Sequence, residues 1–195
     1  MYFYILAGLV VAVILISRIR HFTPYVFTLL SWTFGIVSLW ILIRYSIQLA
    51  PLAVVGNDFV NKEIIFGPGI YLKPATLFMF TAFLYFAFSL ESPIWKQRFR
   101  NMAPELRKIM LIGAFLVTIT AIFEFIYNAI WWASQIFMGQ SPDQVVNPYP
   151  QVLGFSMQIN VAFALKIITL ILGCSVYTIS YLWRFDKSEK PEGSG

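Results

Sequence analysis

The stretch 109–138, IMLIGAFLVTITAIFEFIYNAIWWASQIFM, decides the fold of this chain. Its one charged side chain is Glu124, and the other positions are apolar, small or uncharged. About 20 consecutive apolar residues are enough to cross a lipid bilayer as a helix. The stretch therefore predicts a membrane-spanning helix that carries one carboxylate at membrane depth.

Similar apolar stretches occur along the whole chain. Of the 195 residues, 59% are hydrophobic and 12% are charged, whereas soluble domains carry about 25% charged residues. This composition excludes a soluble globular enzyme and a disordered chain. We expect an all-α integral membrane protein with five transmembrane helices, in which residues 1–185 form one polytopic membrane domain and residues 186–195 a hydrophilic tail. The five predicted spans cover residues 2–17, 24–50, 74–90, 109–138 and 155–183.

The positions of lysine and arginine predict the orientation of these spans. Ten of the 14 basic residues fall in the segments 18–23, 94–108 and 184–190, which five spans place on one side of the membrane. Because cytoplasmic loops carry the excess of lysine and arginine, we expect a cell-membrane protein with its N-terminus outside and its C-terminus in the cytoplasm. The net charge of +5 then reflects basic residues that determine the topology and attract anionic lipids. No nucleic-acid partner is expected.

The connections between the spans predict smaller elements. Residues 94–108 combine aromatic and basic side chains, which is typical of an amphipathic helix on the inner membrane surface. In the outer loop 51–73, turn signals at 56–57 and 67–69 flank a strand-forming run and predict a short β-hairpin. The second outer loop, 139–154, contains three prolines and predicts irregular structure.

The counts of cysteine and histidine limit the chemistry of the isolated chain. A single cysteine, Cys174, excludes an intramolecular disulfide, and a single histidine, His21, is too few for this chain alone to hold haem or a histidine-rich zinc site. The sequence also lacks a phosphate-binding glycine loop and a zinc-protease motif. We therefore expect no catalytic residue, cofactor or metal, and no enzymatic activity of the chain on its own.

Glu124 and Lys166 are the main candidates for a functional site. A charge in the middle of a span costs several kcal/mol on most scales, and at about 1.5 Å per residue both fall in the middle-to-outer membrane. They predict a structural ion pair between the fourth and fifth spans, a substrate or proton site, or a contact with a partner subunit or lipid. Helical spacing adds a polar lining to this region, formed by Tyr127, Asn128, Trp131, Gln135, Gln158 and Thr169.

The second span carries two further features. Arg44 lies near its outer end, where the side chain either extends to the interface or binds an anionic group. Ser31, Gly35 and Ser38 form a stripe of small residues at helical spacing, which is typical of a helix-packing face in lipid.

Together these observations favour a non-catalytic accessory or structural subunit of a larger membrane-bound complex, for example an energy-transducing or oxidising enzyme complex. Its partners would be the bilayer and other membrane subunits, or further copies of itself. The alternative is a small homo-oligomeric transporter or channel that uses the polar region around Glu124 and Lys166. An intramembrane enzyme is disfavoured because the chain offers no activated nucleophile or metal set at one depth.

Overall fold

The structure is a computed structural model that describes residues 2–19, 24–45, 54–67, 70–152 and 155–189. The described helices are α1 (Tyr2–Ile16), α2 (Pro24–Arg44), α3 (Asn57–Asn61), α4 (Pro74–Glu91), α5 (Pro93–Arg100), α6 (Pro104–Phe137) and α7 (Val161–Glu189). The described strands are β1 (Ile64–Gly67), β2 (Ile70–Leu72), β3 (Val146–Val152) and β4 (Phe155–Asn160).

Four of these helices, α2, α4, α6 and α7, are long and apolar enough to cross a membrane. Helix α1 is apolar but has 15 residues. At about 1.5 Å per residue it is about 22 Å long, shorter than the roughly 30 Å hydrocarbon core. The chain therefore has the architecture of a multi-pass membrane protein, with four candidate spans and a shorter apolar helix among the described residues.

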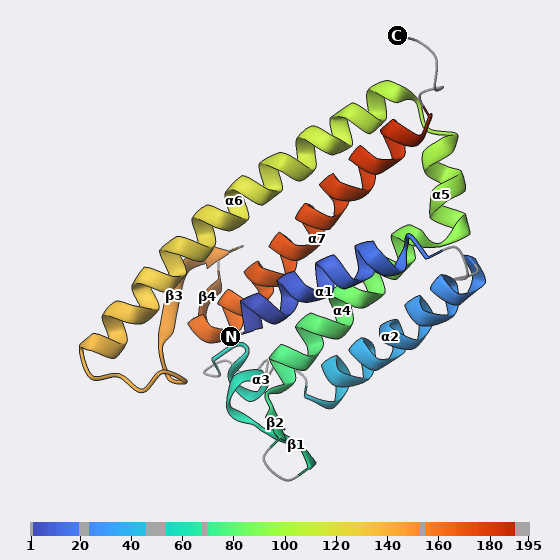
Figure 1. Ribbon diagram of the computed structural model, residues 1–195. Helices are drawn as coiled ribbons and strands as arrows, with labels where there is room; N and C mark the ends of the chain where they lie inside the picture. Colours follow the sequence, from blue (N-terminus) through green and yellow to red (C-terminus); the bar gives the residue numbers. More distant parts are fainter. Residues whose placement is uncertain (1, 20–23, 46–53, 68–69, 153–154, 190–195) are drawn as a thin grey trace.

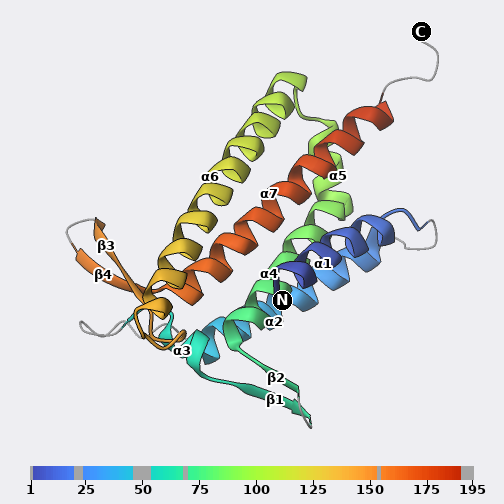
Figure 2. The ribbon, with the colours of Figure 1, turned by 60° about the vertical axis from the view of Figure 1, so that its left-hand side comes forward.

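The four long helices form one layer in the order α2, α4, α7 and α6 (Figure 1, Figure 2). Helix α1 packs on α4 and α7. The main core lies between these elements and includes Leu6, Val13, Phe27, Phe83 and Tyr177. Helix α6 is at one edge of the layer, with α7 as its main neighbour.

The fifth predicted span is shorter at its start than expected, because helix α7 begins at Val161 and not at residue 155. Residues 155–160, FSMQIN, form strand β4, which pairs antiparallel with β3. Their alternation of apolar and polar residues is the two-residue period of a strand. Asn160 then marks the start of the helix, since its Oδ1 accepts hydrogen bonds from the backbone N–H groups of Ala162 and Phe163, at 3.0 and 3.3 Å. The expected irregular structure in 139–154 is therefore wrong where β3 forms.

Other boundaries also differ from the sequence prediction. Helix α6 begins at Pro104, five residues before the predicted span, and helix α7 continues into the predicted tail as far as Glu189. The end of the second predicted span, residues 46–50, lies outside the described residues. A hairpin is present in the loop 51–73 as β1 and β2, but the first part of the predicted strand-forming run lies in helix α3, so the hairpin is shorter than expected. The predicted amphipathic helix is present as α5, which ends at Arg100.

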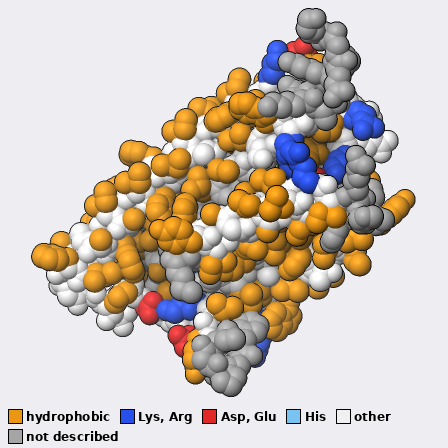
Figure 3. Space-filling view, viewed as in Figure 1, with side chains coloured by type: hydrophobic (Ala, Val, Ile, Leu, Met, Phe, Trp, Pro, Cys, Tyr) orange, Lys and Arg blue, Asp and Glu red, His pale blue; other side chains and the backbone are white. Residues whose placement is uncertain are grey.

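The elements between the long helices gather at two ends of the layer. We call the end with α3 and the four strands the hairpin end, and the end with α5, the start of α6 and the end of α7 the basic end. On the face that Figure 3 shows, charged side chains gather at these two ends, and the band between them is mostly hydrophobic. Such a band is what the apolar core of a bilayer requires.

Candidate functional site

A buried cluster of charged and polar side chains centres on Glu91, the last residue of α4. Its side chain is 4% exposed. Oε1 accepts hydrogen bonds from Arg184 Nη2 at 2.9 Å and from the Tyr177 hydroxyl at 2.8 Å. Oε2 lies 3.2 Å from Lys96 Nζ. Burial of a carboxylate is tolerated because these donors replace its water shell.

Local sequence explains why these groups meet. Pro93 disfavours a helical conformation at Ser92, which is extended, so α4 ends and α5 starts in a new direction. One turn into α5, Lys96 faces back to Glu91. Tyr177 and Arg184 are seven residues apart on α7 and therefore share a face.

Arg184 extends the cluster to the first helix. Its Nη1 donates to the Ser17 hydroxyl at 2.8 Å, directly after α1. Its guanidinium also lies over the rings of Tyr177 and Tyr181, 5.8 and 5.9 Å from their centroids. The cluster thus joins α1, α4, α5 and α7. Because Glu91 is surrounded by donors, the arrangement holds helices together and does not present a free acid or base.

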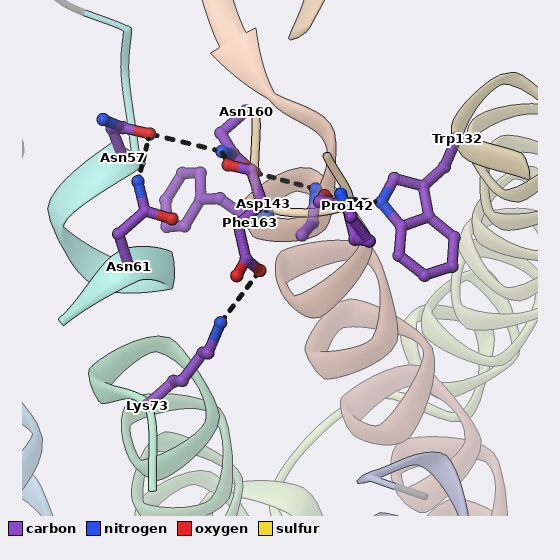
Figure 4. Close-up of polar contacts among 9 residues, drawn as sticks. Asn57, Asn61, Lys73, Trp132, Pro142, Asp143, Asn160 and Phe163 are labelled. Carbon is purple, nitrogen blue, oxygen red and sulfur yellow. Dashed lines mark hydrogen bonds and ion pairs between the residues drawn. The ribbon is translucent and has the colours of Figure 1, made fainter. Parts of the chain in front are cut away.

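The hairpin end carries a second polar cluster (Figure 4), in which Asn160 is fully buried. Its Nδ2 donates to the carbonyl oxygen of Asp143 at 2.8 Å and lies 3.4 Å from Asn57 Oδ1. Lys73 Nζ forms an ion pair with Asp143 Oδ1 at 2.8 Å. Asn160 therefore ties the loop before β3 and the start of α3 to the start of α7.

The turn before α3 also depends on close packing against α7. Gly56 has φ of 85°, a left-handed conformation that favours glycine. A Cβ atom at this position would overlap the ring of Phe163. The backbone of Val55 bonds to β4, through Gln158 O at 2.9 Å and Asn160 N at 3.0 Å. The described residues from Val55 to Phe163 thus tie α3 to β4 and to the start of α7.

The predicted pair Glu124 and Lys166 is placed in two different surroundings. Glu124 is partly exposed on α6, and its Oε2 lies 3.5 Å from Asn128 Nδ2. Lys166 is 6% exposed, and the charged groups that act on it include Lys73 and Asp143 at the hairpin end. The hydrogen bonds of Glu124 include the one from Asn128, and the pairing of Glu124 with Lys166 stays a prediction.

A line of amides runs from Glu124 toward the hairpin end. Asn128 is fully buried and donates to the Glu124 carbonyl oxygen at 2.9 Å. Its Oδ1 lies 3.4 Å from Asn147 Nδ2 on β3. Asn128 therefore connects a carboxylate at membrane depth with the β3–β4 hairpin.

The other residues of the predicted polar lining are not gathered on one surface. Tyr127 is exposed, Trp131 donates to the Val146 carbonyl oxygen at 3.3 Å, and Gln135 is partly exposed. Gln158 is exposed on β4, so it does not share a helix face with Lys166, as had been expected from a longer fifth span. The Thr169 hydroxyl is buried and donates to Leu165 O in its own helix at 2.6 Å.

The small residues of α2 lie against α4. The hydroxyls of Ser31 and Ser89 are hydrogen bonded, and Ser38 donates to Thr81 at 2.8 Å. A Cβ atom at Gly35 would approach the Tyr85 ring to 3.0 Å. Arg44 is exposed at the last position of α2.

Glu91 directly follows the predicted span 74–90, and sequence reasoning did not identify it as the centre of a polar cluster. Its contact with Arg184 joins residues 93 positions apart, and no motif marks such a pair. Sequence reasoning did not identify Asn160 because it lies inside the apolar run 155–183, which was assigned to a single span. The alternation of apolar and polar residues at 155–160 could have indicated a strand that ends where α7 begins.

No group of three histidine, cysteine, aspartate or glutamate side chains within the described ranges could hold a metal ion. Comparisons of the chain with protein-family models, with curated proteins and with solved structures found no match.

Proposed function

We propose that this chain is a non-catalytic integral membrane subunit of a larger membrane-bound complex. The observation that carries the proposal is Glu124, a partly exposed carboxylate on the edge helix α6. At about 1.5 Å per residue, it lies about 30 Å from the start of α6 and about 20 Å from its end. Such a group in lipid costs several kcal/mol, and a donor from a neighbouring subunit would remove that cost.

The surface of α6 supports this assignment. Most of its apolar side chains outside the α7 contact are exposed, among them Ile112, Leu116, Ile119, Phe123, Ile126 and Ile130. Lipid can cover these residues, but it cannot satisfy Glu124. The described hydrogen bond of the carboxylate comes from Asn128 on the same helix, and its two oxygens have acceptor sites for a further donor from another subunit.

The finer topology is part of the same proposal. Helix α1 would be a fifth span, accommodated by local thinning of the bilayer or by packing within the complex. The basic end would face the cytoplasm and the hairpin end the outside, because the basic end carries the excess of lysine and arginine. The membrane would then be the cell membrane.

The test is the native mass of the tagged chain, extracted from its source membrane in mild detergent, with identification of the co-purifying proteins. The proposal expects stoichiometric membrane partners in addition to the 22.4 kDa chain. Glu124→Gln should weaken their retention, whereas Glu105→Gln, which removes a carboxylate from an exposed site at the start of α6, should not. A chain that is isolated without stoichiometric partners would overturn the proposal.

A homo-oligomeric transporter or channel is the second candidate. The amide line from Glu124 through Asn128 to Asn147 favours it, because it gives polar groups a path from membrane depth to the hairpin end. This candidate expects a homo-oligomer in the same mass measurement. In liposomes with a trapped pH-sensitive dye, it also expects a proton flux that Glu124→Gln abolishes; a flux that is unchanged in this variant would contradict it.

A further inference from the structure

Basic side chains at the basic end fall into two groups. Lys96 and Arg184 are used inside the protein, where they bind Glu91. Arg98, Arg100 and Lys108 are exposed instead. No ion pair with a described acidic residue is formed by these three side chains. These three side chains therefore add positive charge to the surface of the basic end, where Figure 3 shows Lys and Arg side chains.

Helix α5 presents this charge from a fixed position. Phe99 is 1% exposed and packs on α7, with its ring centroid 5.3 Å from that of Tyr181 and 6.3 Å from that of Phe185. On the other sides of the helix, Ile94 is 58% exposed and Trp95 is 36% exposed. The helix thus combines an anchored aromatic residue with exposed apolar and basic side chains.

The location of α5 indicates what its exposed residues meet. It begins two residues after the apolar helix α4 ends, at the boundary of the hydrophobic band. Tryptophan is enriched at this boundary in membrane proteins. The guanidinium of Arg98 lies 5.0 Å from the Trp95 ring centroid, which holds a charge next to the interfacial aromatic. Exposed apolar and basic residues together on one helix are typical of contact with a membrane surface.

We infer that the basic end binds anionic phospholipid head groups, with Arg98, Arg100 and Lys108 as the residues that contact the phosphate. An acidic protein would complement the charge, but it would leave unexplained why Ile94 and Trp95 are exposed beside the arginines at the level where α4 ends. The inference is independent of the partner subunits proposed above, since it concerns residues of α5 and the start of α6 and not Glu124.

The experiment is a lipid titration of the full chain in mild detergent, followed by native mass spectrometry. Phosphatidylglycerol is compared with phosphatidylcholine of the same acyl chains. The double variant Arg98→Gln with Arg100→Gln is compared with the double variant Lys62→Gln with Lys73→Gln, which removes the same number of positive charges from the hairpin end. A third variant, Arg98→Lys with Arg100→Lys, keeps the charge.

The wild-type chain should bind phosphatidylglycerol more tightly than phosphatidylcholine. Because each basic side chain near an anionic surface contributes about 1 kcal/mol, the loss of two should weaken phosphatidylglycerol binding on the order of 30-fold. The hairpin-end variant should bind like the wild type, and the lysine variant should retain most of the affinity.

Equal binding of the two lipids by the wild type would overturn the inference, and so would an equal loss of affinity in both glutamine variants. If the Arg98→Gln with Arg100→Gln chain does not fold, the inference is tested by the wild type and the lysine variant alone. Both should bind phosphatidylglycerol more tightly than phosphatidylcholine, and equal binding of the two lipids would overturn the inference. Native mass of the subunit complex reports on the proposed function separately, because that measurement depends on partner proteins and not on added lipid.

Discussion

Glu91 and Arg184, which are 93 residues apart in the chain, form an ion pair of 2.9 Å at the basic end. The pair connects the end of α4 to the last turns of α7. Arg184 also reaches Ser17 at the end of α1, so a single guanidinium joins three helices. The Glu91 side chain is 4% exposed and that of Arg184 is 21% exposed, so the carboxylate is less accessible to solvent than the guanidinium.

Removal of the Glu91 carboxylate should destabilise the fold strongly. Breaking a buried ion pair by removing one partner costs about 3 to 5 kcal/mol, because the other charge is left without compensation. Arg184 is partly exposed, so we expect Glu91→Ala to be near the lower end, about 3 kcal/mol. Equilibrium unfolding in mixed micelles measures this cost.

Glu91→Gln separates charge from packing at this position, and Glu105→Gln is the control at an exposed site. Glu91→Gln keeps an acceptor for the Tyr177 hydroxyl and should cost less than Glu91→Ala. Glu105→Gln, at an exposed site, should stay within about 0.5 kcal/mol of the wild type. If Glu91→Ala is as stable as Glu105→Gln, the cluster does not hold the helices together.

Gly56 and Gly139 form a matched pair for a second prediction. Both have positive φ, 85° and 94°, so an alanine at either site pays the left-handed backbone cost of about 1 to 2 kcal/mol. Only at Gly56 would the new Cβ overlap a neighbour, the Phe163 ring; at Gly139 there is nothing within 4 Å. Gly56→Ala should therefore be the more destabilising by at least about 1 kcal/mol.

Thermal unfolding of the two variants side by side checks this difference. An equal loss of stability in the two variants would mean that the left-handed backbone conformation accounts for the whole effect at both sites. The turn at Gly56 would then not pack on Phe163 of α7 as described.

The parts of the fold that follow from local sequence were predictable. Two of the predicted spans start at a proline, Pro24 and Pro74, and α2 and α4 begin there. This works because the missing N–H and the fixed φ of proline act within one helical turn. The turn at 67–69 predicted the β1–β2 hairpin for the same kind of reason.

Non-local pairing was not predictable from the sequence. Residues 155–160 were assigned to the fifth span because they continue an apolar run, but they pair with β3, which an isolated hydropathy profile does not register. Lys96, which binds Glu91, is five residues away in the sequence, but Arg184 comes from the far end of the chain. A single sequence contains no signal for such a contact.

Asn160 carries a third prediction. Its Oδ1 caps α7, and its Nδ2 binds the Asp143 carbonyl oxygen. Asn160→Ala should cost about 2 kcal/mol, since a cap is worth about 1 kcal/mol and a buried carbonyl loses its donor. Asn160→Asp keeps the cap but places a buried carboxylate oxygen against the Asp143 carbonyl oxygen, so it should cost at least as much as Asn160→Ala.

Exposed Asn61 provides the control for this series, because its Nδ2 contributes a hydrogen bond to Asn57 at 2.8 Å without a helix cap. Asn61→Ala should cost less than either Asn160 variant in the same unfolding measurement. An Asn160→Ala chain as stable as Asn61→Ala would show that the cap does not support the hairpin end.

The contact between α1 and α7 provides the last prediction. A Cβ atom at Gly173 would lie 2.8 Å from Leu6 Cδ2, so α1 approaches α7 through a glycine. Gly173→Ala should therefore force Leu6 or the whole of α1 to move, at a cost of about 1 to 3 kcal/mol. Gly113→Ala on α6, where nothing lies within 4 Å, should be neutral or slightly stabilising, because alanine is the better helix former.

A double-mutant cycle with Leu6→Ala tests whether the clash is the cause. Leu6→Ala alone should destabilise the chain, because Leu6 is 3% exposed in the main core. In the Leu6→Ala background the Gly173→Ala change should cost little, since the side-chain end that it meets has been removed. Additive losses in the two variants would mean that Leu6 and Gly173 are not coupled, and that α1 does not dock on α7 at this glycine.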